Sequence, residues 1–116
     1  MPGRPPGERR PPPTLDEALG AFKSAVLRPD GRCMESAHFA DQMAQAGFDA
    51  SDLTRLAHQG RIPRAPEWDT PHRAWKFRIE GHGVDRRWLG VIFNVMGPHA
   101  VKAVTVLRRG KRRRGT

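Results

Sequence analysis

The spacing of apolar residues changes at Gly60, and this change constrains the fold of the chain more than any other feature. Before Gly60, apolar side chains recur every three or four residues, which is typical of amphipathic helices. After it they alternate, as in Trp75, Phe77 and Ile79, which is typical of strands on a half-buried sheet. The pattern predicts an α+β fold with a helical first half and a sheet in the second half.

Three short helices are expected in the first half. Each begins at a residue that can cap a helix: Thr14, Ser36 and Asp49. Glu17 completes a capping box in the first helix, which should end before Pro29. Gly47 and Gly60 are placed to end the second and third helices.

The second half predicts a meander of strands over residues 74–80, 86–95 and 101–107. Pro63 and Pro66 confine any further strand in residues 61–68 to an edge of the sheet. The expected architecture is therefore a set of short N-terminal helices packed on a three- to four-stranded antiparallel sheet.

Positive charge is concentrated at the two ends of the chain. The net charge is +9, yet residues 14–107 hold 12 basic and 11 acidic side chains. We expect residues 1–13, with six of the 11 prolines, to be a disordered arm, and residues 14–107 to be a single domain. Residues 108–116 should be a disordered basic tail that either aids solubility or binds phosphate. Its cations are Arg108, Arg109, Lys111, Arg112, Arg113 and Arg114.

Several classes of protein are disfavoured by what the sequence lacks. The single cysteine, Cys33, excludes an internal disulfide and a multi-cysteine zinc site, and no two histidines stand at i, i+4. There is no phosphate-binding Gly-Lys-Ser/Thr loop and no dinucleotide fingerprint, so neither a metal nor a cofactor is expected. Without an apolar run of ~18 to 20 residues or a secretory signal, the chain is expected in the cytoplasm and not in a membrane.

His38 is the first candidate for chemistry. It follows the Ser36 cap in the first helical turn, where the unpaired backbone N–H groups can bind a phosphate. An imidazole there could transfer protons at neutral pH. Alternatively, His38 only covers the helix end.

A second candidate lies on the polar face of the 74–80 strand. Lys76 and Arg78 stand two residues apart on that face, and Arg86 can reach it across the hairpin. Such cations could hold a scissile phosphate while a ribose 2′-hydroxyl attacks it, without a metal. Arg73, just before the strand, is a further candidate. The alternative is an exposed face whose cations form ordinary ion pairs with Glu80.

The stretch from Ser36 to Phe48 (SAHFADQMAQAGF), then Asp52-Leu53, Gly60-Arg61-Ile62 and Ala103–Val106, resembles a family of bacterial toxin-like domains of unknown function. In that family a helix opens with Ser-x-His, a second short helix ends in Gly, and the last strand carries Thr-Val. The family is similar in layout to BrnT and RelE toxins, which are metal-independent ribonucleases. The resemblance implies a RelE/BrnT-like fold and a toxin-type endoribonuclease of a toxin–antitoxin or effector system. Its substrate would be RNA and its partner an acidic antitoxin or immunity protein.

By position, the resemblance makes His38 the acid–base residue and places the structural glycine at Gly60 and the basic residue that enters the sheet at Arg73 or Arg78. Lys76, Arg78 and Arg86 would hold the phosphate, and Thr105 would orient a group by hydrogen bonding. The chain departs from the family at Gln42 and Ala46, where the family carries arginines. The alternative function is therefore a non-catalytic module that binds nucleic acid or protein and carries a cationic tail.

Overall fold

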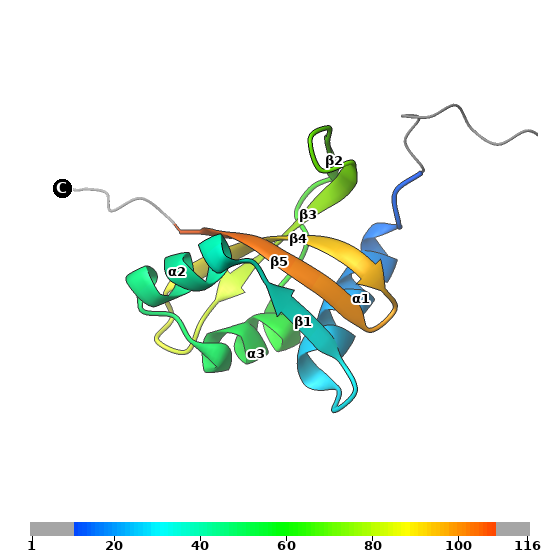
Figure 1. Cartoon of the computed structure of the whole chain (residues 1–116). Helices are drawn as coiled ribbons and strands as arrows, with labels where there is room; N and C mark the ends of the chain where they lie inside the picture. Colours follow the sequence, from blue (N-terminus) through cyan, green and yellow to red (C-terminus); the bar gives the residue numbers. More distant parts are fainter. Residues whose placement is uncertain (1–10, 109–116) are drawn as a thin grey trace, which may run out of the picture.

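The computed structural model describes residues 11–108 and contains three helices and five strands (Figure 1). In chain order the elements are α1 (Leu15–Leu27), β1 (Arg32–Glu35), α2 (Ala37–Ala46), α3 (Ala50–Gln59), β2 (Glu67–Asp69), β3 (Ala74–His82), β4 (Trp88–Gly97) and β5 (Ala100–Leu107). The α+β class predicted from the sequence is confirmed. The predicted disordered segments fall mainly on residues 1–10 and 109–116, which lie outside the described residues.

All three helices begin where the caps predict. The Thr14 hydroxyl accepts a hydrogen bond from the Glu17 backbone N–H, and the Glu17 carboxylate accepts from the Thr14 N–H. Asp49 starts α3 with a second capping box, formed with Asp52. α2 ends at Gly47, whose φ of 75° is a left-handed conformation that glycine adopts without steric cost.

The sheet has the order β1-β5-β4-β3-β2, so the predicted three- to four-stranded antiparallel meander is wrong in two respects. There are five strands, and β1 runs parallel to β5, with Cys33 opposite Val101. β1 has four residues with charged side chains at both ends, too short a stretch to show an alternating pattern. Its pairing joins residues about 70 positions apart, which no local signal in the sequence reports.

The prediction that any strand in residues 61–68 lies at an edge is confirmed by β2, which is the outer strand beside β3. The strands predicted over 74–80, 86–95 and 101–107 correspond to β3, β4 and β5. A bulge in β5 near Val104 shifts the register against β4 between Ile92 and Phe93.

Helices α1 and α3 cover one face of the sheet (Figure 1). Phe22 of α1 packs on Phe93 of β4 with ring centroids 5.0 Å apart, and Phe77 of β3 stacks on Phe93 at 5.8 Å. These side chains are fully buried or nearly so. Because side chains alternate along a strand, the residues between the buried ones face away from α1 and α3.

Helix α2 lies along the edge of β5 that β1 leaves uncovered. β1 pairs with β5 only as far as Ala103, and beyond that point α2 provides the hydrogen-bond partners. The Ser36 hydroxyl donates to the Val104 carbonyl at 3.3 Å, and the Gln42 Oε1 accepts from the Val106 backbone N–H at 2.8 Å. The side chains of the N-cap residue Ser36 and of Gln42 in α2 thus protect a strand edge that would otherwise be open.

Candidate functional site

The face of β3, β4 and β5 that points away from α1 and α3 carries several residues singled out from the sequence. Arg78 pairs with Ile92, and Ile92 pairs with Thr105, so the three stand in one row across the strands. At about 4.8 Å per strand, Arg78 and Thr105 are roughly 10 Å apart at the backbone. The structure therefore places two of the predicted site residues on one surface, two strands apart.

Arg78 is engaged within its own strand. Its Nε lies 2.7 Å from the Glu80 carboxylate, and its guanidinium lies 5.9 Å from the centroid of the Trp88 ring. The side chains of Arg78 and Glu80 are both half-buried, so their ion pair is packed into this face of the sheet. The ion-pair alternative considered for Arg78 and Glu80 is what the structure shows.

Lys76 and Arg86 lie on either side of that row. Lys76 pairs in register with Glu67 of β2. Arg86 lies in the turn between β3 and β4, before Trp88, and Trp88 is four residues or roughly 13 Å along the strand from Ile92. The structure thus spreads Lys76, Arg78 and Arg86 along the length of β3 and its turn, and a shared phosphate between them stays a prediction.

A cleft of about 950 Å³ opens where the β2–β3 hairpin leaves the rest of the sheet. β3 pairs with β4 only from Phe77 onward, whereas Ala74–Lys76 pair with β2. Figure 1 shows β2 and the start of β3 projecting beyond the other strands. The polar and ionisable residues lining the cleft include His38, Asp69, His72, Arg73, Asn94 and Lys102.

The cleft joins elements that are far apart in the sequence. His38 comes from the first turn of α2, Lys102 from β5, and Arg73 from the β2–β3 turn. The two predicted site residues brought together here are His38 and Arg73. Lys76, Arg78, Arg86 and Thr105 do not line this cleft, although Val104, the neighbour of Thr105, does.

Asn94 marks the point at which β3 and β4 separate. Its side-chain Nδ2 donates to the Trp75 carbonyl at 2.9 Å, so a side chain bridges the strands where no pairing of β3 with β4 continues. Asn94 itself pairs with Lys102 of β5. Asn94, which lines the cleft, is therefore held by both neighbouring strands.

Asp69 and His72 form a hydrogen-bonded pair at the cleft wall. His72 Nδ1 lies 2.9 Å from Asp69 Oδ2, and the His72 backbone N–H donates to Asp69 Oδ1 at 3.3 Å. The Asp69 side chain is 14% exposed and the His72 ring 77% exposed. Burial alone raises the pKa of Asp69, but the two hydrogen bonds from His72 and the positive charges of His72 and Lys76 outweigh it, and the pKa falls below its usual value.

Arg73 adopts a left-handed backbone conformation, with φ of 53°. This conformation costs a non-glycine residue roughly 1–2 kcal/mol. Arg86, in the β3–β4 turn, is the other non-glycine residue with a positive φ among residues 11–108, at 62°. Each arginine thus occupies a turn position that favours glycine, but only Arg73 lines the cleft.

Arg87 fixes the far end of α2. Its guanidinium donates to the carbonyls of Ala46 and Gly47 at 2.6 and 2.8 Å, and it lies 4.4 Å from the centroid of the Phe48 ring. These are the last carbonyls of α2, which lack partners inside the helix and carry the negative end of the dipole. Arg87 therefore ties the β3–β4 turn to the helix that carries His38.

Asp52 makes a second tie between the same turn and the helices. It is 4% exposed, and its two carboxylate oxygens accept from the backbone N–H groups of Asp49 and Val84 at 2.8 Å each. A Cβ added at Gly83 would lie 2.4 Å from the Asp52 carboxylate. Glycine at position 83 is therefore required by this close approach.

Gln42 and Ala46, where the chain departs from the family pattern, both have structural roles. Gln42 uses a side-chain acceptor that arginine does not have. The Ala46 carbonyl accepts a hydrogen bond from the Arg87 guanidinium, and the Ala46 side chain packs against the core. The departures are thus accompanied by contacts that hold α2 on the sheet.

Gly60, the glycine singled out by the resemblance, ends α3 with φ of −71°. A Cβ there would lie 2.6 Å from the Leu56 carbonyl and 2.8 Å from Ile79. Close packing between α3 and β3 accounts for this glycine.

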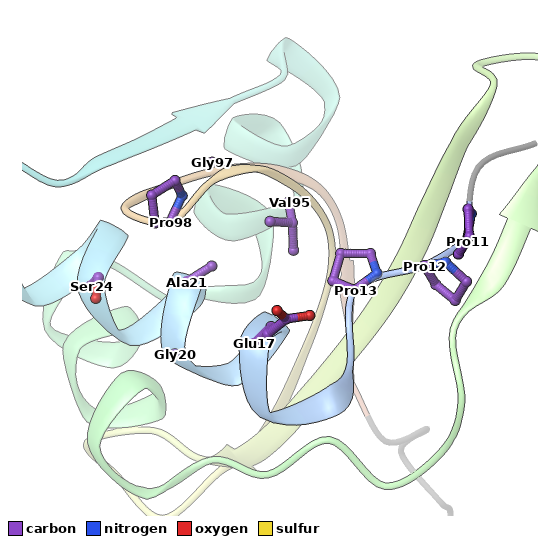
Figure 2. Close-up of a pocket in the computed structure, with 10 residues that line it drawn as sticks. All are labelled: Pro11, Pro12, Pro13, Glu17, Gly20, Ala21, Ser24, Val95, Gly97 and Pro98. Carbon is purple, nitrogen blue, oxygen red and sulfur yellow. The ribbon is translucent and has the colours of Figure 1, made fainter. Parts of the chain in front are cut away.

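A second groove, of about 700 Å³, lies between α1 and the turn that joins β4 and β5. Figure 2 shows Pro11–Pro13 beside it, with Val95 and Pro98 among its lining residues. Glu17 is the one ionisable residue among the described residues that line this groove. It offers less chemistry than the cleft that contains His38.

The predicted tail site falls almost entirely outside the described residues. Arg108 is described and exposed, whereas Arg109, Lys111, Arg112, Arg113 and Arg114 lie outside. Within residues 11–108, no group of three or more His, Cys, Asp or Glu side chains is placed to hold a metal ion. None of the helices in this part of the chain is long and apolar enough to cross a membrane.

Comparison with protein-family models, with curated proteins and with solved structures gave no match. The resemblance to BrnT- and RelE-type toxins therefore stays a prediction from the sequence.

Sequence reasoning missed three ionisable residues of the cleft: Asp69, His72 and Lys102. The first two carried a usable signal, because Asp at i with His at i+3 around Thr70-Pro71 is typical of a turn held by the Asp side chain. Lys102 carried no such signal. It lies in the cleft with His38 only because α2 packs beside β5, and local sequence patterns do not report that packing.

Proposed function

We propose that the protein is a metal-independent endoribonuclease of the toxin type, acting on RNA in the cytoplasm. The observation that carries the proposal is the meeting of His38, Arg73 and Lys102 in one cleft. An imidazole and two cations are the groups needed to move a proton and to hold a phosphodiester.

The reaction would be attack of a ribose 2′-hydroxyl on the adjacent phosphorus. The 2′-oxygen gives its proton to a base, the new P–O2′ bond forms, and the P–O5′ bond breaks. The departing 5′-oxygen takes up a proton, so the products are a 2′,3′-cyclic phosphate and a 5′-hydroxyl. No oxidant, cofactor or metal is consumed in this step.

In this mechanism His38 transfers a proton, and Arg73 and Lys102 stabilise the charge on the phosphate. Lys76, Arg78 and Arg86 were predicted to hold the scissile phosphate and Thr105 to orient a group, but none of them lines the cleft. In this proposal they contact the RNA outside the cleft instead. Arg108 and the cations that follow it would add phosphate contacts without sequence preference. An acidic antitoxin or immunity protein would suit the net charge of +9.

The test is incubation of the purified protein with mixed RNA in EDTA. Wild type should give fragments with 2′,3′-cyclic phosphate ends, and His38→Ala should be at least ~100-fold slower. The matched control is His82→Ala, because His82 is also exposed but does not line the cleft. Intact RNA in every condition, or equal rates for the two variants, contradicts the proposal.

A second candidate function is a non-catalytic module that binds nucleic acid or protein. It is favoured by the Arg78–Glu80 ion pair. Arg78 was predicted to hold the scissile phosphate, but its guanidinium is already paired with the Glu80 carboxylate. This function predicts binding of RNA with no cleavage over hours. Removal of residues 108–116 would then abolish most of the affinity, whereas a nuclease would keep its cleavage pattern.

A further inference from the structure

Cleavage of RNA by the proposed route needs two proton transfers. One group must take the proton of the 2′-hydroxyl, and another must supply a proton to the departing 5′-oxygen. His38 can serve for one of these transfers, and a second titratable group of the cleft is available for the other.

His72 has the surroundings expected for that second group. Its Nδ1 is engaged by the Asp69 carboxylate at 2.9 Å, which leaves Nε2 as the nitrogen available to a ligand. A carboxylate in this position fixes the tautomer and the orientation of the ring and stabilises the imidazolium. The backbone N–H of His72 binds the other carboxylate oxygen, so both members of the pair are held by the same turn.

The exposures of the two side chains fit this division of roles. Asp69 is largely buried, as befits a group that orients another one, while the His72 ring is mostly open to solvent. Arg73 follows directly in the chain and lines the same cleft in its left-handed conformation. The turn thus brings a candidate proton donor and a phosphate-binding cation side by side.

We propose that His72, oriented by Asp69, is the second catalytic residue of the cleft and acts as the general acid opposite His38. This inference rests on the proposed endoribonuclease function. His38 accepts the proton of the 2′-hydroxyl, and protonated His72 donates the proton on Nε2 to the 5′-oxygen as the P–O5′ bond breaks. Asp69 is a positioning residue that does not contact the substrate.

The test compares two substrates that differ in the leaving group. One is a dinucleotide such as UpA, whose 5′-alkoxide must be protonated, and the other is uridine 3′-(4-nitrophenyl phosphate), whose phenoxide leaves without a proton. His72→Ala should lose at least ~100-fold on the dinucleotide and less than ~5-fold on the aryl ester. His38→Ala should lose a large factor on both substrates, and the control His82→Ala on neither.

Asp69→Asn adds a readout that a merely structural role would not give. Asparagine can present either its carbonyl oxygen or its NH₂ group to His72 Nδ1, so the tautomer of the ring is no longer fixed, and Asp69→Asn should lose rate on the dinucleotide but not on the aryl ester. Circular dichroism melting of each variant checks that the fold is retained.

Wild-type activity on the dinucleotide with no loss in His72→Ala overturns this inference and leaves the proposed function standing. Equal losses on both substrates also overturn it, because they indicate a role in binding or folding. Failure of the wild type to cleave either substrate refutes the proposed function, and the role of His72 falls with it.

Discussion

The side-chain oxygen of Gln42 accepts a hydrogen bond from the backbone N–H of Val106 at 2.8 Å. α2 is thereby bound to the edge of β5 at a position where β1 no longer pairs. The helix that carries His38 is held in place partly through this bond, so a residue that departs from the family pattern contributes to the geometry of the cleft.

Gln42→Arg, which introduces the residue found in the toxin-like family that the sequence resembles, should therefore destabilise the protein. Arginine has no acceptor, and an unsatisfied part-buried N–H costs about 1–3 kcal/mol. Urea denaturation should show a loss in this range. The same substitution at the exposed Gln45 should change the free energy of unfolding by less than ~0.5 kcal/mol. Equal effects at positions 42 and 45 would show that the bond to Val106 is unimportant.

Arg87→Ala should loosen the end of α2. It removes two hydrogen bonds to helix carbonyls and the contact with Phe48, for an expected loss of about 1–2 kcal/mol at this partly exposed site. Amide hydrogen exchange should accelerate in α2 more than in α1. Arg86→Ala is the control, because the Arg86 side chain makes no hydrogen bond or ion pair within residues 11–108. Uniform exchange in both variants argues against the proposed tie.

The two arginines with positive φ allow a matched test of the cleft. Arg73→Gly and Arg86→Gly both relieve a left-handed conformation, and each variant should keep or gain up to ~1 kcal/mol of stability. Arg73→Gly should weaken the binding of single-stranded RNA more than Arg86→Gly does, because only Arg73 lines the cleft, and it should reduce the salt slope by about 0.7 for one lost phosphate contact. Equal losses of RNA affinity in the two variants would contradict a specific role of the cleft in binding RNA.

The Asp69–His72 pair should make stability depend on pH at the acidic end. Because the pKa of Asp69 is lowered in the folded state, its contribution is present above the unfolded value of about 3.9 and is lost as the pH falls through the folded value. The wild type should thus be more stable than Asp69→Asn at pH 7, and the difference should shrink below pH ~4. Melting temperatures from pH 7 to pH 2 measure this, and a difference independent of pH contradicts it.

Cys33 should react slowly with thiol reagents. Burial, and then the nearby charge of Glu35, raise the pKa of this thiol from 9.0 to about 11, so the thiolate fraction near neutral pH falls about 100-fold. Alkylation by iodoacetamide at pH 7.5 should be slower by about this factor in the folded protein than in 8 M urea. Because the pKa of Cys33 is higher in the folded protein than in the unfolded chain, the buried neutral thiol contributes stability below about pH 9. This stability is lost as the pH rises through 11. Similar alkylation rates in both states would contradict the burial of Cys33.

Most of the fold could be predicted from local signals. Thr14, Ser36 and Asp49 cap the helices as expected, and the alternation of Trp75, Phe77 and Ile79 located β3. β1 could not be found in this way, because its four residues acquire their conformation from pairing with β5 far along the chain.

The candidate site was predicted less well, for a related reason. His38 and Arg73 stand at a helix start and a strand start, which local patterns identify. The cleft itself opens where the β2–β3 hairpin separates from β4, beside the hydrogen bond from Asn94 to the Trp75 carbonyl, and no local pattern in the sequence reports this point. Sequence spacing also could not show that Arg78 is engaged by Glu80 while Lys102 faces the cleft.

The most direct measurement uses a DNA oligonucleotide with one internal ribonucleotide, incubated in EDTA and analysed by mass spectrometry. If the cleft performs the proposed reaction, the oligonucleotide is cut only on the 3′ side of the ribose, giving a 2′,3′-cyclic phosphate and a 5′-hydroxyl. The all-DNA oligonucleotide then stays intact, as does the chimera incubated with His38→Ala. Cleavage of both oligonucleotides by the wild type, or of neither, contradicts the account.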